Sequence, residues 1–290
     1  MSVSNWFEEF NKNIRMSTEA VNNISYRYKR ITKQLNKDFY NSESELTHSL
    51  YVGSYGRGTD IVTSDIDMIF QLPYSTYTQY NAYTSNGQSA LLQAVKTSIE
   101  KTYKSRMKAD GQVIVISFTD NITFELVPAF LNNDDSFTFP DSNNGGSWKT
   151  TNPKPEIKEI REKNILWNKN LKRLCRMIRA WKYNCNVPIG GLLIDTLAYK
   201  FMTNYAYKDK SYLYYDFISR DFFKYLSEQN SEQNYWLSPG SNQYVWRKGN
   251  FEYKAKQAYN LSLEAITKEK DYPYTAKSKW REIYGTKFPS

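Results

Sequence analysis

The amino-acid sequence predicts an α+β protein, because strand-like segments gather in its first half and helical segments in its second. Residues 122–127 alternate apolar and polar side chains, as half-buried strands do. Residues 155–183 instead repeat apolar side chains at the spacing of a single long helix. Residues 131–153 are rich in Asn, Asp, Ser, Gly and Pro and are expected to form a loop. We therefore expect two lobes, residues 1–150 and 151–290, with the active site in the cleft between them.

The other elements follow from the same periodicities. One apolar stripe runs along residues 6–40 and predicts a long N-terminal helix of roughly 50 Å. Residues 54–60, rich in glycine, are expected to be a loop between two strands, and Asp120-Asn121 a hairpin turn. Further strands are expected at 49–53, 64–72 and 112–118, and further helices at 88–104, 190–205, 217–228, 251–269 and 278–284.

The composition is that of an ordinary folded protein with an excess of positive charge. The chain has 290 residues, of which 40% are hydrophobic and 24% charged, and its formal net charge is +9. A field of this sign attracts the phosphates of nucleic acids, nucleotides or lipid head groups without distinguishing among them. The 25 tyrosines suit surfaces that bind planar ligands, although a composition rich in Asn, Lys and Tyr explains them equally well.

The cysteines and the single histidine limit the possible chemistry. Cys175 and Cys185 fall in one predicted helix about 15 Å apart, which is too far for a disulfide. With His48 as the only histidine, the chain lacks the ligands of a usual structural zinc site, and we expect His48 to be structural. We find no signal peptide and no apolar stretch near the roughly 18 residues that span a bilayer. We therefore expect a cytoplasmic protein with no zinc and no membrane association.

Three acidic residues on predicted strands are candidate metal ligands. Asp65 and Asp67 alternate with apolar residues, so both carboxylates point to one face of their strand, about 6–7 Å apart. Glu125 lies opposite the apolar face of its own strand. Three such carboxylates suit two magnesium ions, with manganese as an alternative. A lone Asp-x-Asp is usually a solvated pair, and Glu125 could be a solvent-facing acid, but the strand context and the preceding Gly-Ser favour a metal site.

The glycine-rich segment before Asp65 is a candidate phosphate-binding loop. Gly53 lets the backbone approach a ligand closely, and Ser54 and nearby backbone N–H groups can donate hydrogen bonds to phosphate oxygens. Tyr55 could stack near a nucleotide base, although a packing role is favoured. Arg57 could contact phosphate, and surface exposure explains it equally well.

The helical half adds a basic stripe and an aromatic group. Lys172, Arg176 and Arg179 recur at helical spacing beside an apolar stripe, and on spacing alone a solvated helix face is favoured over a binding role. Packing is likewise favoured over base stacking for three aromatic residues around a Pro-Gly-Ser turn: Tyr235, Trp236 and Tyr244.

The chain resembles the DNA polymerase β-type nucleotidyltransferases in three stretches, GSYGRGT, DIDMIF and FELVPAF. More narrowly, it is similar to the bacterial cGAS/DncV-like nucleotidyltransferases, the SMODS-type synthases of cyclic di- and oligonucleotides in anti-phage signalling. The likeness covers nearly the whole chain, because it continues through LKRLCRMIRAWK, IGGLLIDTLAY, YWLSPGSNQYV and REIYGTKFP.

This resemblance implies a polymerase β-like catalytic lobe with a mixed sheet and a helical nucleotide-binding lobe. It implies an Mg²⁺-dependent enzyme that condenses nucleoside triphosphates (ATP, GTP or pyrimidine nucleotides) into a cyclic di- or trinucleotide with release of pyrophosphate. The product would act on a downstream effector in CBASS defence. By the same resemblance Asp65, Asp67 and Glu125 form the metal triad, and Gly53 and Ser54 contact the triphosphate.

The resemblance also assigns residues in the helical lobe. Arg179 best matches a basic residue aimed at the triphosphate, with Lys182 second. Two departures from the family pattern are Glu125, where Asp is usual, and Gly190-Gly191, where many relatives carry Ser-Ser. The chain lacks the zinc-binding insertion of the animal DNA-sensing relative, so activation by double-stranded DNA is not expected.

Three other functions remain open at this point. The same chemistry could extend RNA or tRNA, or it could transfer a nucleotide onto tRNA or a protein, as a toxin does. A non-catalytic nucleotide sensor is the alternative of another class, although it would not need three converging carboxylates.

Overall fold

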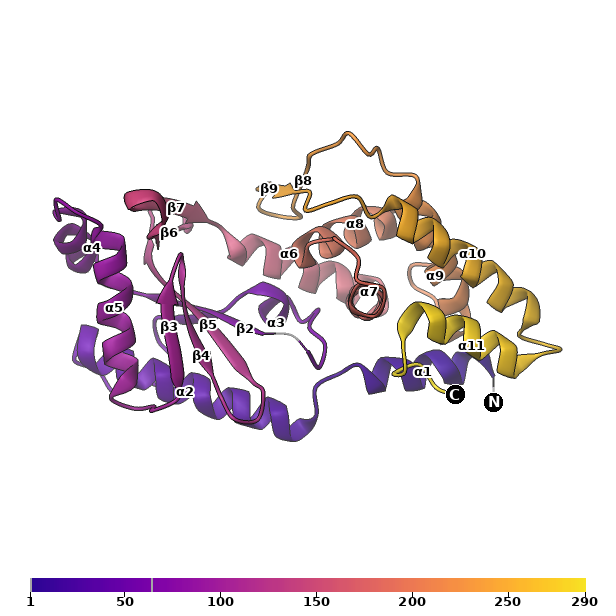
Figure 1. The fold of residues 1–290 in the computed structure, drawn as a ribbon, viewed down its shortest axis with the longest axis horizontal. Helices are drawn as coiled ribbons and strands as arrows, with labels where there is room; N and C mark the ends of the chain where they lie inside the picture. The colour runs from indigo at the N-terminus through magenta and orange to yellow at the C-terminus, as the bar shows by residue number, and fades with distance from the viewer. Residues whose placement is uncertain (1, 64) are drawn as a thin grey trace. The chain divides into compact units, whose positions relative to one another are not determined.

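The computed structural model describes residues 2–63 and 65–290, and the chain forms two compact units (Figure 1). The sheet unit comprises Met16–Gly56 and Thr63–Lys154. The helical unit comprises Met1–Arg15, Arg57–Val62 and Pro155–Ser290. The chain thus passes into the second unit close to the expected boundary, but two earlier segments also belong to the helical unit.

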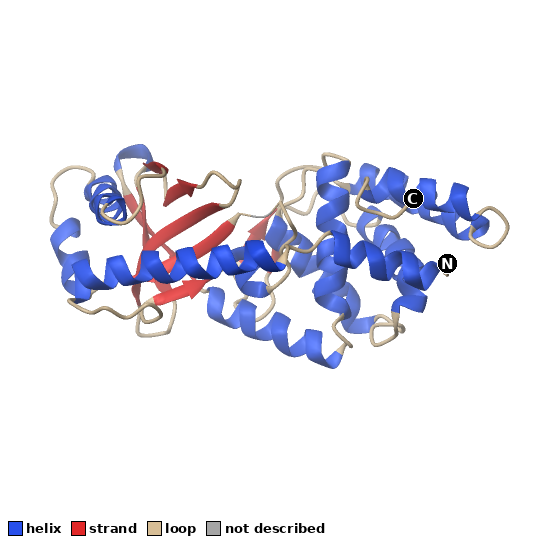
Figure 2. Ribbon diagram, turned by 90° about the horizontal axis from the view of Figure 1, so that it is seen from below, coloured by secondary structure: helices blue, strands red, loops and turns tan. Residues whose placement is uncertain are grey.

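The sheet unit is built on a mixed seven-stranded sheet (Figure 2). Five strands follow the order β1-β2-β5-β4-β3, and β6 continues from β5 and pairs with β7. Strands β2 and β5 are parallel, whereas the other pairs are antiparallel. The strands are β1 (Ser49–Tyr51), β2 (Ile66–Gln71), β3 (Arg106–Asp110), β4 (Val113–Ser117), β5 (Thr123–Leu131), β6 (Phe137–Asp141) and β7 (Ser147–Thr151).

Two helices bury the apolar face of this sheet. Helix α2 (Thr18–Tyr40) contributes Ile24, Ile31 and Leu35 to the core, and α5 (Gly87–Glu100) packs beside it. The strands contribute Ile66, Met68, Phe124 and Leu126, all fully buried. Because strand side chains alternate between faces, the residues between these four lie on the other face of the sheet. Helices α3 (Gly53–Arg57) and α4 (Tyr74–Asn81) complete the unit, with the short 3₁₀ helix η1 (Asn143–Gly145).

The helical unit encloses a second core. Phe7 and Phe10 of α1 (Val3–Asn13) pack on Trp280 and Tyr284, with ring centroids 5.1 Å apart for Phe7 and Trp280. The remaining elements are α6 (Pro153–Leu166), α7 (Asn170–Asn184), α8 (Gly191–Asn204), η2 (Tyr212–Tyr214), α9 (Tyr215–Ser227), β8 (Tyr235–Leu237), β9 (Tyr244–Trp246), α10 (Glu252–Lys268) and α11 (Pro273–Tyr284).

Two long helices predicted from the sequence are each divided. The prediction over residues 6–40 was wrong at its start, because α1 ends at Asn13 and the long helix α2 begins at Thr18. Ser17 caps α2 by accepting a hydrogen bond from the N–H of Ala20 at 3.1 Å. The prediction over residues 155–183 was also wrong. Asn168 and Lys169 adopt positive φ values of 48° and 64°, which end one helix before the next begins.

Two predicted loops contain regular structure. Residues 131–153 include strands β6 and β7, which pair with each other in register from Phe137↔Thr151 to Asp141↔Ser147. Residues 54–60 lie partly in the short helix α3. Two predictions are confirmed: the helix at 88–104, where α5 lies, and the hairpin around Asn121. The sequence analysis missed three elements: α4, β3 and the β8–β9 hairpin.

Candidate active site

The predicted acidic residues lie on neighbouring strands of the sheet unit. Asp67 and Glu125 are direct partners in the parallel register of β2 and β5. Asp65 comes immediately before β2. Because the residues that alternate with these acids are buried, Asp67 and Glu125 lie on the face of the sheet opposite the core, and both are half-buried. The structure therefore brings these acids together as the alternation predicts, with Asp65 exposed beside them.

The electrostatics of this face favour a cation. The pKa of Glu125 is raised by burial and further by the charges of Asp67 and Asp65. Burial also raises the pKa of Asp65. Crowded carboxylates of this kind are stabilised by a divalent cation, for which their oxygen atoms are suitable ligands. The oxygen donors are of the kind that such an ion prefers, but among the described residues no group of three His, Cys, Asp or Glu side chains is placed to hold a metal.

Gly53 leaves room for the carboxylate of Asp67. The backbone N–H of Val52 donates to the carbonyl oxygen of Asp67 at 3.0 Å, which holds the end of β1 against β2. Gly53 follows with a φ of +58°, and a Cβ built there would lie 1.7 Å from Asp67 Oδ2. Any side chain at this position would displace the carboxylate. Gly53 is thus a structural requirement of the acidic site.

Ser54 and Tyr55 lie in α3, directly after Gly53. The N–H of Gly56 donates to the carbonyl of Val52 at 2.8 Å, which closes the first turn. The ring of Tyr55 packs against Tyr51 with centroids 4.9 Å apart and joins the edge of the sheet core. Its ring is therefore used in packing, which agrees with the favoured interpretation from sequence.

Arg57 and Arg179, both predicted to contact phosphate, are instead buried and paired with Asp195 in the helical unit. Arg179 makes a bidentate contact with Asp195 at 2.6 and 2.9 Å, and Arg57 Nε donates to Asp195 Oδ2 at 2.9 Å. Thr59 donates to the same oxygen at 2.9 Å, and Arg57 Nη1 lies 3.7 Å from Glu156. The arginine side chains are 6% and 4% exposed, and that of Asp195 is 0% exposed.

This pairing corrects the role expected of the two arginines. Burial alone would raise the pKa of Asp195, but the charges of Arg179 and Arg57 hold it at about 2. The two guanidinium groups therefore neutralise a buried carboxylate and are not available to a triphosphate. Sequence reasoning missed Asp195, whose only signal is a single acid in the apolar helix α8.

Lys182 lies in a more open, basic environment. Its pKa is lowered by burial and then by the charges of Lys248 and Arg179. The stem of Lys248 approaches Gly190, where a Cβ would lie 3.6 Å from its Cδ. Gly190 is the N-cap of α8 and provides no side-chain cap. Within the described chain neither lysine has an acidic partner, so both amines and the positive end of α8 favour an anion. Lys248 had no recognisable signal in the sequence.

His48 and the cysteines have structural environments. The ring of His48 stacks on Tyr40 with centroids 3.7 Å apart, and His48 Nδ1 lies 2.6 Å from Asn36 Oδ1. Burial lowers the pKa of His48. The structural role predicted for His48 is confirmed by these contacts. Cys175 and Cys185 are free thiols.

Among the described helices none is both long and apolar enough to cross a membrane.

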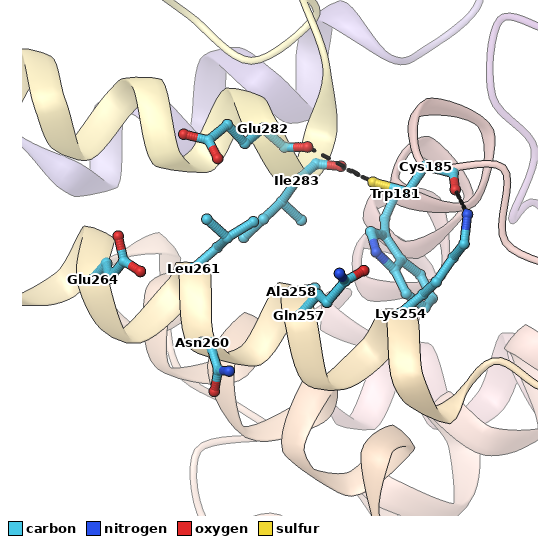
Figure 3. Close-up of a pocket in the computed structure, with 10 residues that line it drawn as sticks. All are labelled: Trp181, Cys185, Lys254, Gln257, Ala258, Asn260, Leu261, Glu264, Glu282 and Ile283. Atoms are coloured by element: carbon cyan, nitrogen blue, oxygen red, sulfur yellow. Dashed lines mark hydrogen bonds between the residues drawn. The ribbon is translucent and has the colours of Figure 1, made fainter.

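A hollow of about 460 Å³ lies between α10, α11 and the end of α7 (Figure 3). Trp181, Leu261 and Ile283 are apolar side chains in its lining, and it also presents the carboxylates Glu264 and Glu282. The amine of Lys254 is already bonded to backbone carbonyls at the end of α7. Two carboxylates and an occupied lysine disfavour the binding of a phosphate in this hollow.

The mixed sheet, the long helix beside it and the acids on paired strands are the arrangement expected of a nucleotidyltransferase. Residues 1–164 match the family described as the Second Messenger Oligonucleotide or Dinucleotide Synthetase domain, SMODS. Because this match covers more than half of the chain, the chain belongs to the SMODS family. It is therefore a nucleotidyltransferase of the class that makes cyclic second-messenger nucleotides, enzymes that generally use divalent metal.

Individual relatives are distant in sequence and similar in fold. A probable cyclic nucleotide synthase of Bacillus cereus (strain VD146) is 23% identical over 279 residues, covering 82% of this chain and 81% of that protein. Vibrio cholerae DncV cyclic AMP-GMP synthase has a TM-score of 0.72 at 12% identity, covering 100% of this chain and 98% of that one. E. coli MS115-1 CdnC, solved with ATP, has a TM-score of 0.69 at 14% identity, covering 99% and 98%. Both likenesses confirm the predicted fold.

Proposed function

We propose that this protein condenses nucleoside triphosphates into a cyclic di- or trinucleotide in an Mg²⁺-dependent reaction. The pairing of Asp67 with Glu125 across two parallel strands carries the proposal, supported by the room that Gly53 leaves for Asp67. Asp65, Asp67 and Glu125 would hold two magnesium ions, with manganese as an alternative, and bound metal supplies neutralisation of the charge on the reacting phosphate.

The reaction is a phosphoryl transfer between two nucleotides. A ribose hydroxyl of one attacks the α-phosphorus of the other; the new P–O bond forms as the bond to pyrophosphate breaks, and the hydroxyl proton passes to a carboxylate or to water. Repetition on the linear product closes the ring. In this scheme Gly53 and Ser54 position the triphosphate beside the acidic residues.

The helical unit contributes a revised set of phosphate contacts. Lys182 is kept as a phosphate contact from the sequence prediction. Lys248 is added, because its charge lowers the pKa of Lys182 and its side chain approaches Gly190 at the N-terminus of α8. Arg57 and Arg179 are assigned a positioning role, because their donors fix the segment after α3 to Asp195. The Ser-Ser contact of many relatives would be replaced at Gly190-Gly191 by backbone N–H groups and lysine amines.

Purified protein incubated with all four labelled nucleoside triphosphates and Mg²⁺ tests this function. We expect small phosphatase-resistant products, whose mass gives the bases and ring size. Asp67→Asn should abolish them, whereas Glu45→Gln, at an exposed acid in the same unit, should not. Lengthened RNA would establish tailing, label on tRNA or protein would establish a toxin, and triphosphate binding without product would establish a sensor.

The biological setting is a further part of this proposal. We place the product in anti-phage (CBASS) signalling in the cytoplasm, where it would bind a downstream effector. Cells that carry the protein with its genomic neighbours should resist phage, and Asp67→Asn should remove that resistance. Equal resistance with and without Asp67 would separate the protein from such signalling.

A further inference from the structure

A second hollow lies in the sheet unit, between α4 and the hairpin of β5 and β6. Its volume is about 350 Å³. The lining combines aromatic and apolar side chains with uncharged polar ones: Tyr74, Tyr77, Phe130, Leu131, Asn132, Asn133 and Thr138. Ligand pockets in proteins hold about 300–1,000 Å³, so a hollow of this size fits a molecule of one or two rings and not a long chain.

This hollow is separate from the acidic site. Tyr74 follows the end of β2 and Phe130 lies near the end of β5, whereas Asp67 and Glu125 lie near the start of the same two strands. Because β2 and β5 are parallel, the acids lie at one end of the pair and the hollow at the other. At about 3.3 Å per residue, the strand from Glu125 to Phe130 spans roughly 17 Å. A ligand in the hollow therefore does not compete for the acidic residues.

The surroundings of the hollow favour an uncharged ligand. None of the described residues that line it carries a charge. Two acids in the turn between β5 and β6 are already paired: Asp134 accepts a hydrogen bond from the N–H of Ser136 at 3.1 Å, and Asp135 lies 3.6 Å from Lys154. A phosphate or an ammonium group in the hollow would lose hydration without a free opposite charge to replace it.

An exposed aromatic ring forms one wall. The side chain of Tyr74 is 74% exposed, and its ring stacks on that of Tyr77 with centroids 5.6 Å apart. Tyr77 in turn packs on Phe130 at 5.3 Å and on Trp148 at 4.9 Å. The indole N–H of Trp148 donates to Asn81 at 2.9 Å, which holds the end of α4. The exposed ring is thus supported from behind, and a flat ligand can stack on it without rearrangement.

The polar residues of the lining divide into two kinds. Asn132 is used within the hairpin, because it donates to Ser136 Oγ at 2.9 Å and accepts from Thr138 Oγ1 at 3.0 Å. Within the described chain, neither the hydroxyl of Tyr77 nor the amide of Asn133 has a hydrogen-bond partner. A phenol and a carboxamide can each donate and accept. These two groups therefore match hydroxyl or amide groups on a ligand.

We propose that this hollow binds a small uncharged molecule that has a flat ring face and hydroxyl or amide groups at its edge. The ring stacks on Tyr74, and the edge forms hydrogen bonds with Asn133 and Tyr77. Nucleosides without phosphate and neutral sugars share this chemistry, whereas nucleotides lack a cation to receive their phosphates. The inference does not depend on the proposed function, because none of the residues assigned to the acidic site takes part.

Adenosine and the neutral sugar N,N′-diacetylchitobiose are suitable probes, titrated into the full-length Asp67→Asn protein and followed by NMR. Saturating ATP and Mg²⁺ keep adenosine out of a nucleotide site. At least one probe should bind, and Tyr74→Ala should weaken adenosine binding about 5- to 150-fold, the equivalent of about 1–3 kcal/mol per stacked base. Tyr74→Phe should retain most of the affinity. Tyr253→Ala removes an equally exposed ring, also 74%, from α10 and should have no effect.

The polar half of the site is tested by removing one hydrogen-bonding group at a time. Tyr77→Phe and Asn133→Ala should each weaken binding of the probe about 2- to 12-fold, as loss of about 0.5–1.5 kcal/mol predicts. Absence of binding by both probes, or unchanged affinity in Tyr74→Ala, would overturn the proposal. So would self-association that depends on Tyr74 without binding of a probe, since the face would then be a protein interface. Cyclic product made by a protein that binds neither probe would refute this inference alone.

Discussion

Replacing Gly53 with alanine tests the link between the start of α3 and the acidic site. The new Cβ would lie 1.7 Å from Asp67 Oδ2 and 2.4 Å from its Cγ. The carboxylate must therefore retreat by more than about 1 Å before the contact becomes an ordinary one. A metal-binding or positioning group displaced by this distance costs roughly 100-fold in rate. The positive φ adds about 1–2 kcal/mol of backbone strain for alanine.

Gly111→Ala provides a matched control for that strain. Gly111 lies in the same unit with a φ of +63°, and a Cβ there would meet only Asn143 Nδ2 at 3.5 Å. Both variants should lose about 2–8 °C in Tm, because 1 kcal/mol corresponds to about 2–4 °C in a protein of this size. Only Gly53→Ala should lose activity, measured as labelled cyclic product per minute at saturating triphosphate. Wild-type activity in a folded Gly53→Ala protein would show that the carboxylate of Asp67 need not occupy this position.

Three further predictions concern stability. Asp195→Asn removes the carboxylate shared by Arg57 and Arg179 and leaves only Glu156, 3.7 Å from Arg57, as a nearby counter-charge; it should lower the free energy of unfolding by roughly 3–5 kcal/mol in urea titrations, and a loss below about 1 kcal/mol would contradict the pairing. Burial raises the pKa of Asp216 to about 6, so the folded state holds a proton that the unfolded state releases, and stability falls as pH rises from about 4 to 6. Asp216→Asn should therefore raise Tm more at pH 8 than at pH 4, and an equal shift at both would refute this assignment. Ser17→Ala should cost about 1 kcal/mol through loss of the α2 cap, with product formation unchanged.

Periodicity predicted the type of most elements and failed where a helix changes direction. Residues 88–104 and 190–205 were predicted as helices from one apolar stripe each, and α5 and α8 lie there. The stripe over residues 6–40 also continues across the break before Thr18, because α1 and α2 each bury one face in a core of their own. An apolar repeat shows which side chains are buried, but it does not show that they belong to one continuous helix. Ser17 was the one local signal of the break.

Short strands escaped prediction for a related reason. Strands β8 and β9 have three residues each, and β6 and β7 have five. Over so few residues an alternating pattern cannot be distinguished from a polar loop, and the stretch that contains β6 and β7 is dominated by turn-forming residues. Their pairing supplies the stabilisation that the local sequence lacks.

The acidic site and the arginines differ in what a sequence can reveal. Asp67 and Glu125 were predictable because strand alternation alone places a residue on a face, and parallel pairing then brought them into register. Whether an arginine is free for a ligand depends on a partner distant in sequence. Asp195 lies 138 residues from Arg57, and no local pattern connects them. Arg176 adds hydrogen bonds to the carbonyls of Gly58 at 2.7 Å and Asp60 at 3.2 Å.

These bonds give the basic stripe of α7 a function other than ligand binding. Asp195 connects Arg179 with Arg57 and Thr59, and Arg176 donates to the backbone carbonyls on either side of Thr59. Residues 57–60, which follow Gly53 and Ser54, are thereby held by α8 through their side chains and by α7 through their backbone. A substitution that frees Arg179 would therefore loosen this segment and would not simply remove a phosphate contact. The expected signature is a large loss of stability together with lost activity, whereas loss of a phosphate contact at Lys182 should weaken triphosphate binding with stability retained.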